Sequence, residues 1–271
     1  VANTALLPHQ IMPICHAHAL GNSANFSVPG GGKTWMAYAL YFLLQNDPEP
    51  ENVERLLVIC PLSAFMAWER EYTRITGDAQ RDNIVRVVGD EAQRQRIYSE
   101  NREIFLINYE KTRNPDDRTA IINLLRNNRF LVILDESHKI KNFNSQQSEG
   151  VRELATHAHR RLILTGTPMP TRWADLWNQF NFLFPHEITR GDMLGGYEHY
   201  LTRLDDDAEL ATIRRNLRRT WTRITKPQLG LQHVRAKIIP VPMSERQTII
   251  YDIIATQVLH DAERGDWINA L

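Results

Sequence analysis

The sequence predicts an α/β fold in which helices cover both faces of a mostly parallel sheet. Five short runs of β-branched and apolar residues recur along the chain, at 56–60, 84–88, 104–107, 130–134 and 162–164. These runs are almost entirely apolar rather than alternating, which is typical of strands that are covered on both faces. Helix-like segments separate several of them, and this alternation indicates βαβ units with right-handed crossovers. Because ligands bind at the carboxyl ends of such strands, we expect the chemistry to lie in the loops that follow them.

The composition is that of a globular chain with a sizeable core. Of its 271 residues, 42% are apolar and 24% are charged, and 32 Lys and Arg balance 32 Asp and Glu. This composition excludes wholesale disorder. The chain contains no apolar run of about 18 residues, so no membrane-spanning helix and no membrane partner are expected. Two cysteines, Cys15 and Cys60, provide neither a disulfide framework nor a metal cluster, and they fit a reducing compartment.

The predicted helices lie at 34–44, 64–75, 118–126, 148–155 and 174–184, the first of them before the run at 56–60. Further on, apolar residues from Leu210 to Ile224 fall three or four positions apart, which predicts one amphipathic helix that Pro227 ends. A short strand at 237–241 is expected next. The last predicted helix begins at Ser244, with Gln247 three positions on in a capping-box pattern.

A glycine-rich loop precedes the first of these helices and reads Ser-Val-Pro-Gly-Gly-Gly-Lys-Thr over residues 27–34. Its backbone N–H groups can wrap a phosphate, and the following helix adds its positive N-terminal dipole. The residues expected to cradle the phosphates are Pro29, Gly30, Gly31 and Gly32. Lys33 would reach the β- and γ-phosphates, and the Thr34 hydroxyl would bind Mg²⁺. The strict pattern has Gly where Ser27 stands, and the alternative is a glycine-rich turn before a buried helix.

Two adjacent acids end the apolar run at 130–134. Asp135 and Glu136 would be costly at the end of a buried strand unless a cation compensates them. Mg²⁺ is the natural compensation, with Asp135 holding it directly or through water. Glu136 can then orient or deprotonate an attacking water molecule. The alternative is that these carboxylates cap the next helix.

These segments resemble the first lobe of superfamily 2 helicase-type ATPases, in particular the Swi/Snf-type double-stranded DNA translocases. The resemblance extends over residues 6–255 in the order typical of the family, and the fold it implies is RecA-like, that of a P-loop NTPase. Besides Gln10 and the loop at 27–34, the segments that carry it are Cys60-Pro-Leu-Ser63 with Trp68-Glu-Arg-Glu71, Asn108-Tyr-Glu110, Asp135-Glu-Ser-His-Lys-Ile-Lys-Asn142, and Leu164-Thr-Gly-Thr-Pro168 with Leu176-Trp177.

The resemblance implies ATP and Mg²⁺ as cofactors and assigns roles to matching residues. Lys33, Asp135 and Glu136 would be catalytic, and Gln10 would contact adenine. The residues implied to touch DNA phosphates are Ser63, Asn108 and Tyr109, and those implied to couple the nucleotide site to the DNA side are His138, Thr165 and Thr167. The alternative for Tyr109, as for Trp68, is a place in the apolar core.

The function implied is an ATP-driven translocase on double-stranded DNA, of which residues 1–185 would form the first RecA-like lobe. Residues 186–271 would be a helical extension and linker towards a second RecA-like lobe, which in the family carries the arginine fingers. The chain alone is therefore expected to be poorly active. Its expected location is the cytoplasm and nucleoid of a bacterium or phage-infected cell, or the nucleus of a eukaryote.

Two other functions stay open from the sequence. One is a non-catalytic DNA- or protein-binding module that retains the helicase fold, which leaves the intact Lys33 and Asp135 unexplained. The other is an unrelated P-loop enzyme such as a small-molecule kinase, which leaves 135–142 and 165–168 unexplained. A basic stretch is equally open: from Ile213 to Lys237 there are eight Lys or Arg and no Asp or Glu. It could follow a DNA backbone or form a solvated helix face.

Overall fold

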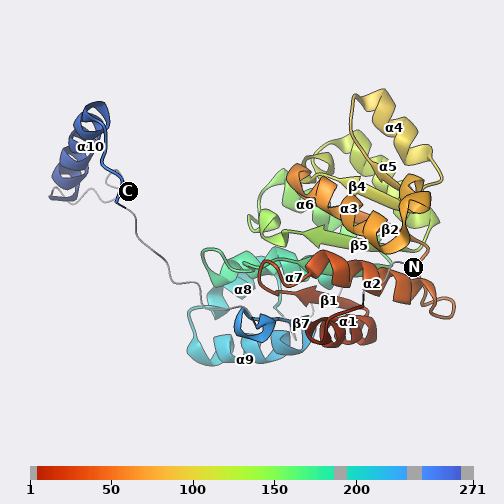
Figure 1. The fold of residues 1–271 in the computed structure, drawn as a ribbon. Helices are drawn as coiled ribbons and strands as arrows, with labels where there is room; N and C mark the ends of the chain where they lie inside the picture. Colours follow the sequence, from red (N-terminus) through yellow and green to blue (C-terminus); the bar gives the residue numbers. More distant parts are fainter. Residues whose placement is uncertain (1–4, 186–193, 231–239, 264–271) are drawn as a thin grey trace. The chain divides into compact units, whose positions relative to one another are not determined.

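The computed structural model describes residues 5–185, 194–230 and 240–263. The chain forms two compact units, one up to Leu231 and one from Gln232. The first unit contains a seven-stranded sheet in which every observed strand pair is parallel. The predicted α/β fold class, a mostly parallel sheet with helices on its faces, is confirmed (Figure 1). Among the described residues, no helix is both long and apolar enough to cross a bilayer.

The strand order in the sheet is β3-β4-β2-β5-β6-β1-β7. The strands are β1 (Asn22–Asn25), β2 (Arg55–Ile59), β3 (Ile84–Arg86), β4 (Ile104–Ile107), β5 (Phe130–Asp135), β6 (Arg160–Leu164) and β7 (Trp221–Thr222). Successive side chains point to opposite faces of a strand, so the apolar runs feed two separate cores. Leu57 and Val132 belong to one core, whereas their neighbours Leu56 and Leu131 belong to the other.

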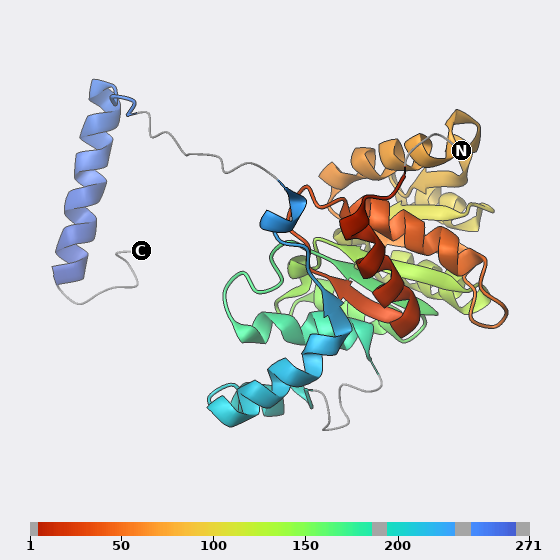
Figure 2. The ribbon, with the colours of Figure 1, turned by 60° about the horizontal axis from the view of Figure 1, so that its bottom comes forward.

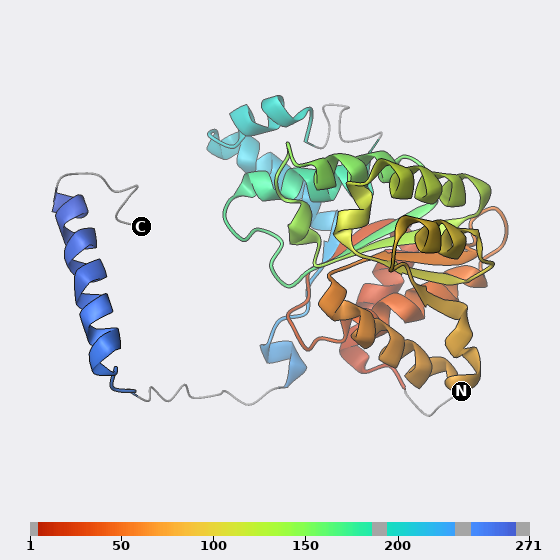
Figure 3. The same ribbon diagram turned by 90° about the horizontal axis from the view of Figure 1, so that it is seen from above.

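Helices cover both faces, as Figures 2 and 3 show from two further directions. The core on one face includes residues of α1 (Pro8–Leu20), α2 (Lys33–Gln45) and α3 (Phe65–Thr76). The other includes residues of α4 (Glu91–Ser99), α5 (Pro115–Asn127), α6 (Gln146–Ala155), α7 (Trp177–Leu183), α8 (Tyr197–Arg203) and α9 (Asp207–Leu217). Short 3₁₀ segments are η1 (Leu62–Ala64), η2 (Asp78–Asn83), η3 (Tyr109–Thr112), η4 (Ser137–Ile140), η5 (Trp173–Leu176), η6 (Arg218–Thr220) and η7 (Pro227–Leu229).

The prediction of one helix from Leu210 to Ile224 is wrong. Helix α9 ends at Leu217, η6 follows, and Trp221 and Thr222 form strand β7 beside β1. The apolar spacing alone does not distinguish a single helix from a helix followed by a strand. Ile213 and Leu217 are buried on one face of α9, whereas Thr222 is buried in the edge strand β7. The five strands predicted further upstream all correspond to observed strands, β2 to β6.

The second unit contains α10 (Glu245–Glu263), which the capping-box pattern predicted. The Oε1 of Gln247 accepts from the Ser244 N–H at 2.9 Å. Most of the predicted strand at 237–241 lies outside the described residues, and residues 240–241 are in no regular element. Helices α8 and α9 and strand β7 lie within the first unit, and the division of the chain at residue 185 stays a prediction.

The sheet order brings three loops to one edge. Strands β5, β6 and β1 are neighbours, so the segments after their carboxyl ends lie side by side. The glycine-rich loop of residues 27–34, called the phosphate loop from here on, comes after β1. The acids at 135–136 stand at the end of β5, and the Thr-Gly-Thr-Pro segment at 165–168 follows β6. Segments far apart in the chain are thereby placed to form a single site.

Candidate nucleotide-binding site

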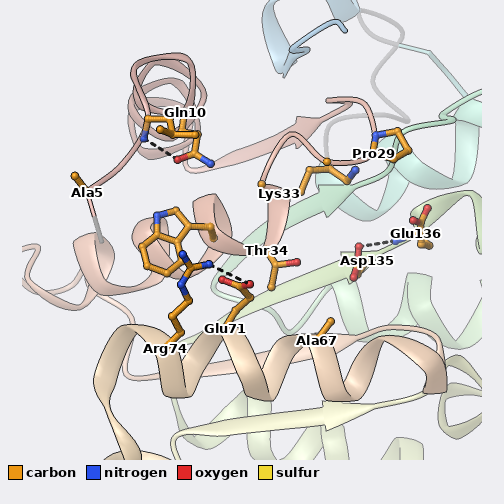
Figure 4. A pocket seen from close by; sticks show the side chains of 14 residues that line it. Ala5, Gln10, Pro29, Lys33, Thr34, Ala67, Glu71, Arg74, Asp135 and Glu136 are labelled. Atoms are coloured by element: carbon orange, nitrogen blue, oxygen red, sulfur yellow. Dashed lines mark hydrogen bonds and ion pairs between the residues drawn. The ribbon is translucent and has the colours of Figure 1, made fainter. Parts of the chain in front are cut away.

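A pocket of about 670 Å³ lies at this edge of the sheet (Figure 4). Its lining residues are Ala5, Leu7, Gln10, Pro29, Gly30, Gly32, Lys33, Thr34, Trp35, Ala67, Glu71, Arg74, Asp135 and Glu136. All the residues predicted to bind nucleotide or metal are among them except Gly31, which is buried within the loop. The structure therefore brings Lys33 and Asp135, 102 positions apart, into one pocket.

The phosphate loop depends on glycine at two positions. Gly30 and Gly32 have φ values of +82° and +78°, a region that side chains with a Cβ rarely adopt. At Gly32 a Cβ would also collide with Nε2 of Gln10. Gln10 itself is held by the Leu7 N–H, which donates to its Oε1 at 2.9 Å. The predicted adenine-contacting amide therefore lies directly against the phosphate loop.

Lys33 is the cation of this pocket nearest the two acids. Its Nζ donates to the carbonyl oxygen of Ser27 at 3.0 Å, so the ammonium group lies inside the curve of the loop. Burial lowers the pKa of Lys33, and the charges of Glu136 and Asp135 oppose that shift. An ammonium group with one backbone partner retains donors for an anionic ligand.

Asp135 is fixed by two donors at the end of β5. The indole N–H of Trp68 donates to Oδ2 at 2.9 Å, and the N–H of Glu136 donates to Oδ1 at 3.0 Å. Burial raises the pKa of Asp135, and the hydrogen bond from Trp68 partly offsets this rise. A nearby cation would favour the charged form, as expected for a carboxylate that binds a metal.

Glu136 has an unusual backbone. Its φ of 54° is the only positive value among the non-glycine residues that the structure describes. Such conformations are held in place by surrounding structure and are common at functional sites. Oε2 of Glu136 lies 3.2 Å from Nδ1 of His138 and 3.4 Å from Oγ1 of Thr165.

The Thr-Gly-Thr-Pro segment contacts both halves of the site. His138 Nδ1 lies 3.1 Å from Oγ1 of Thr165 and 3.4 Å from Oγ1 of Thr167. Between them, an added Cβ at Gly166 would stand 2.9 Å from Cδ of Pro29. The segment thus bridges the acids after β5 and the phosphate loop after β1, while its coupling role stays a proposal.

Several supporting residues were not predicted from the sequence. Ser137 is buried, and its hydroxyl donates to Oε1 of Gln179 at 2.7 Å, while Nε2 of Gln179 donates to the carbonyl oxygen of Pro168 at 2.7 Å. At the other end of the pocket Arg74 lies over the ring of Trp35 at 5.7 Å. No local signal marks these residues, because each acts across a contact between separate elements.

The three residues implied to touch DNA have different environments. Ser63 is exposed on η1, whereas Asn108 and Tyr109 are buried. The Tyr109 hydroxyl donates to the carbonyl oxygen of Asp135 at 2.8 Å, and Trp68 is fully buried. Both aromatic residues therefore lie in the core, which was the alternative open from the sequence. Contact with DNA stays a prediction for Ser63, Asn108 and Tyr109.

The donor set around Asp135 fits Mg²⁺. Thr34 and Asp135 both line the pocket and supply a hydroxyl and a carboxylate oxygen, the hard ligands this ion prefers. Mg²⁺ usually binds through one or two protein oxygens, with water and phosphate completing its shell. No group of three or more His, Cys, Asp or Glu able to hold a metal occurs in the described ranges. A two-oxygen site is consistent with an ion that arrives with nucleotide.

Comparison with known proteins places the chain in a family. The profile of the SNF2-related domain family matches residues 28–269. Helicase-like transcription factor of Mus musculus is 30% identical over 217 residues, which are 76% of this chain and 21% of that protein. An uncharacterized ATP-dependent helicase of Mycoplasma genitalium is 26% identical over 250 residues, 89% of this chain and 22% of that protein.

Among solved structures, the Sulfolobus solfataricus SWI2/SNF2 ATPase core in complex with dsDNA has the same fold. It aligns with a TM-score of 0.69 and 21% identity over 97% of this chain and 54% of that one. This chain spans about a fifth of the length of the two curated relatives. The family match covers most of the chain, including the loop from Val28 onward and the acids after β5. This chain belongs to the SNF2-related domain family.

Proposed function

We propose that this chain is the ATP-binding lobe of a motor that couples ATP hydrolysis to movement along double-stranded DNA. The observation that carries the proposal is the convergence of the phosphate loop, Lys33, Asp135 and Glu136 on one pocket. The backbone N–H groups of the loop and the ammonium group of Lys33 suit the phosphates of a nucleotide. The amide of Gln10, at the end of the pocket away from Asp135, suits its base (Figure 4).

Each residue has a stated part in this proposal. Lys33 would bind the β- and γ-phosphates, and Thr34 and Asp135 would hold the metal. Bound Mg²⁺ would neutralise charge on those phosphates. Glu136 accepts a proton from the attacking water, and His138, 3.2 Å from its Oε2, orients the carboxylate. Thr165 and Thr167, which contact His138, relay the state of the site to the DNA side.

Double-stranded DNA is the proposed partner because a structural relative is described in complex with it. Contacts to the DNA backbone position a motor without reading the sequence of the DNA. A second RecA-like lobe is the other proposed partner, supplying arginine side chains to the γ-phosphate.

The test uses Lys33→Ala in the full-length protein, with Lys111→Ala as a matched control outside the pocket. Phosphate release is measured with and without duplex DNA, and ATP binding is measured separately. We expect Lys33→Ala to weaken ATP binding and abolish DNA-stimulated phosphate release, while Lys111→Ala retains both. Unchanged turnover in Lys33→Ala would overturn the proposal. If the unsubstituted protein binds DNA but releases no phosphate, the result favours a non-catalytic module. If it releases phosphate at a rate that DNA does not change, the result favours an unrelated P-loop enzyme.

A further inference from the structure

A second pocket, of about 320 Å³, lies near the carboxyl ends of β1 and β6 and shares no lining residue with the nucleotide pocket. Its residues come from the ends of β1 and β6, from η5, α7 and α9, and from η6 and β7. They are Phe26, Pro168, Met169, Trp173, Leu176, Phe180, Arg214, Leu217, Arg218, Trp221 and Arg223.

The floor of this pocket is aromatic and aliphatic. Phe26 packs against Phe180 and Trp221, with ring centroids 6.3 Å and 5.8 Å apart. The lining side chains carry no hydroxyl, amide or carboxylate, and their polar groups are the guanidinium groups of the arginines and the indole N–H groups. A group that enters this floor must therefore be apolar, because polar atoms would lose their hydration without gaining partners.

The rim carries three exposed arginines. Arg214 lies over the ring of Trp173 at 4.8 Å, and Arg218 lies over the ring of Trp221 at 4.7 Å, while Arg223 completes the set. Within the described ranges, none of the three forms an ion pair with an Asp or Glu. Their guanidinium groups stand in the basic stretch that the sequence left without a role.

We propose that this pocket docks an acidic peptide segment of another protein through one bulky apolar side chain, with flanking carboxylates on the three arginines. Charge complementarity supports this occupant, since guanidinium groups bind carboxylates in a bidentate manner. The apolar floor disfavours a nucleobase, because the polar edges of a base would be buried there without partners. The proposal does not depend on ATP turnover by this chain.

The docked segment would contact Pro168 and Met169, directly after the Thr-Gly-Thr sequence. The carbonyl oxygen of Pro168 accepts from Nε2 of Gln179 at 2.7 Å, so one side of this turn is already fixed from α7. A peptide in the pocket contacts the other side of the turn. A bound peptide could therefore change the conformation of the Thr-Gly-Thr-Pro segment, whose Thr165 contacts Glu136.

The binding test uses the 271-residue chain and a fluorescein-labelled heptapeptide of six glutamates around a central phenylalanine. We expect saturable binding by fluorescence anisotropy. Replacing the phenylalanine by alanine should weaken binding about tenfold or more, since a buried aromatic side chain is lost. Replacing the glutamates by glutamines should weaken it as well. Absence of saturable binding, or equal affinity for the alanine peptide, overturns the proposal.

Paired arginine variants locate the site. We expect R214A/R218A to weaken binding about three- to tenfold, because two exposed ion pairs are lost. The control R215A/R219A removes the same charge from the same segment outside the pocket and should bind normally. An equal loss in both variants indicates non-specific attraction and overturns the proposal.

Two further experiments test where the peptide binds and whether DNA competes for the same site. With benzoylphenylalanine at the centre of the peptide, photo-crosslinking should label Met169 or a neighbouring pocket residue, and labelling elsewhere contradicts the site. A short duplex DNA is the competing ligand. If the duplex displaces the peptide and R214A/R218A weakens DNA binding more than R215A/R219A does, the patch is a nucleic-acid contact and the proposal fails.

Discussion

Trp35 directly follows Thr34, whose hydroxyl is predicted to bind magnesium, and the guanidinium of Arg74 lies over the Trp35 ring. Arg74 stands at the end of the pocket away from Asp135 (Figure 4). Glu71 lies 3.9 Å from Arg74 across one helical turn and steadies it. Trp35 and Gln10 both line this pocket, and an indole ring can stack on a nucleobase, so we propose Trp35 as the stacking partner of the adenine base.

We therefore expect Trp35→Ala to weaken ATP binding by about 5- to 100-fold, because base–aromatic stacking contributes about 1–3 kcal/mol. Inorganic tripolyphosphate lacks the base, so its affinity should be unchanged. Trp35→Phe should retain most of the ATP affinity. Isothermal titration with both ligands measures the difference, and an equal loss for ATP and tripolyphosphate would place the effect at the phosphates instead.

Residues of the candidate site differ in how far the sequence could predict them. Lys33 was predictable because it ends a glycine-rich loop that precedes an apolar helix, and Asp135 and Glu136 were predictable because they stand where an apolar strand ends. The parts that Trp68 and Arg74 play were not, because the buried Trp68 of α3 acts on the site only through its bond to Asp135, and Arg74 reaches the pocket from the last turn of the same helix.

Among the elements, the end of β7 is attached to the phosphate loop through Ser27, the residue that departs from the strict glycine pattern. The N–H of Ile224 donates to Oγ of Ser27 at 3.0 Å, and the N–H of Val28 donates to the carbonyl oxygen of Ile224 at 3.1 Å. Ser27 is fully buried. The serine hydroxyl therefore links the loop to the segment that follows β7, a bond that glycine cannot supply.

Ser27→Ala should lower the free energy of unfolding by about 1–3 kcal/mol, because the buried N–H of Ile224 loses its partner. Urea unfolding measures this change, and Ser63→Ala, at an exposed serine, is the control. Amide exchange at Ile224 should accelerate in the variant. If Ser27→Ala unfolds like the wild type with unchanged exchange, the link has no energetic role.

Helix α6 approaches η3 at a glycine. A Cβ on Gly150 would collide with the carbonyl oxygen of Thr112, whose own hydroxyl donates to the carbonyl oxygen of Tyr109 at 2.8 Å. Tyr109 in turn supports the backbone of Asp135. The close packing of α6 against η3 thus helps to fix the position of Asp135 through Tyr109.

Gly150→Ala should destabilise the fold by about 1–3 kcal/mol through overpacking. It should also weaken Mg²⁺-dependent ATP binding, because η3 and Tyr109 must shift. Glu149→Ala, at the exposed neighbouring position, should change stability by no more than about 0.5 kcal/mol. Thermal unfolding and ATP titration provide the two readouts, and a fully stable Gly150→Ala would show that α6 can move away freely.

Elements with a strong apolar run could be predicted, and elements without a regular apolar pattern could not. Strand β1 has the sequence Asn-Ser-Ala-Asn, typical of a turn, yet it lies between β6 and β7 in the sheet. Helix α1 contains Pro13 and has no continuous amphipathic pattern. Both form because tertiary packing overrides weak local preference.

At the scale of the whole molecule, the described chain holds one half of a proposed catalytic centre. Arg74 is the only arginine among the pocket-lining residues of the described chain, and it stands at the end opposite Asp135 and Glu136 (Figure 4). No guanidinium of this pocket is therefore placed to neutralise charge at the γ-phosphate. Such arginines contribute about 10³–10⁵ in rate where they act.

We expect the 271-residue chain to bind ATP weakly and to release phosphate at least about 10³-fold more slowly than the full-length protein with duplex DNA. Single-turnover phosphate release with the purified chain measures this rate. Glu136→Gln in the full-length protein should reduce its rate towards that of the chain. Robust turnover by the chain alone would show that the pocket is already complete.

The close approach of Gly166 to Pro29 has a thermodynamic consequence. A Cβ at position 166 would stand 2.9 Å from Cδ of Pro29, so the phosphate loop and the turn that leads to Pro168 are in close contact at this point. Linkage is symmetric: whatever factor a nucleotide imposes on the affinity of a peptide in the second pocket, that peptide must impose on the nucleotide. If the two proposed sites are coupled, we expect the contact between Gly166 and Pro29 to contribute to that coupling.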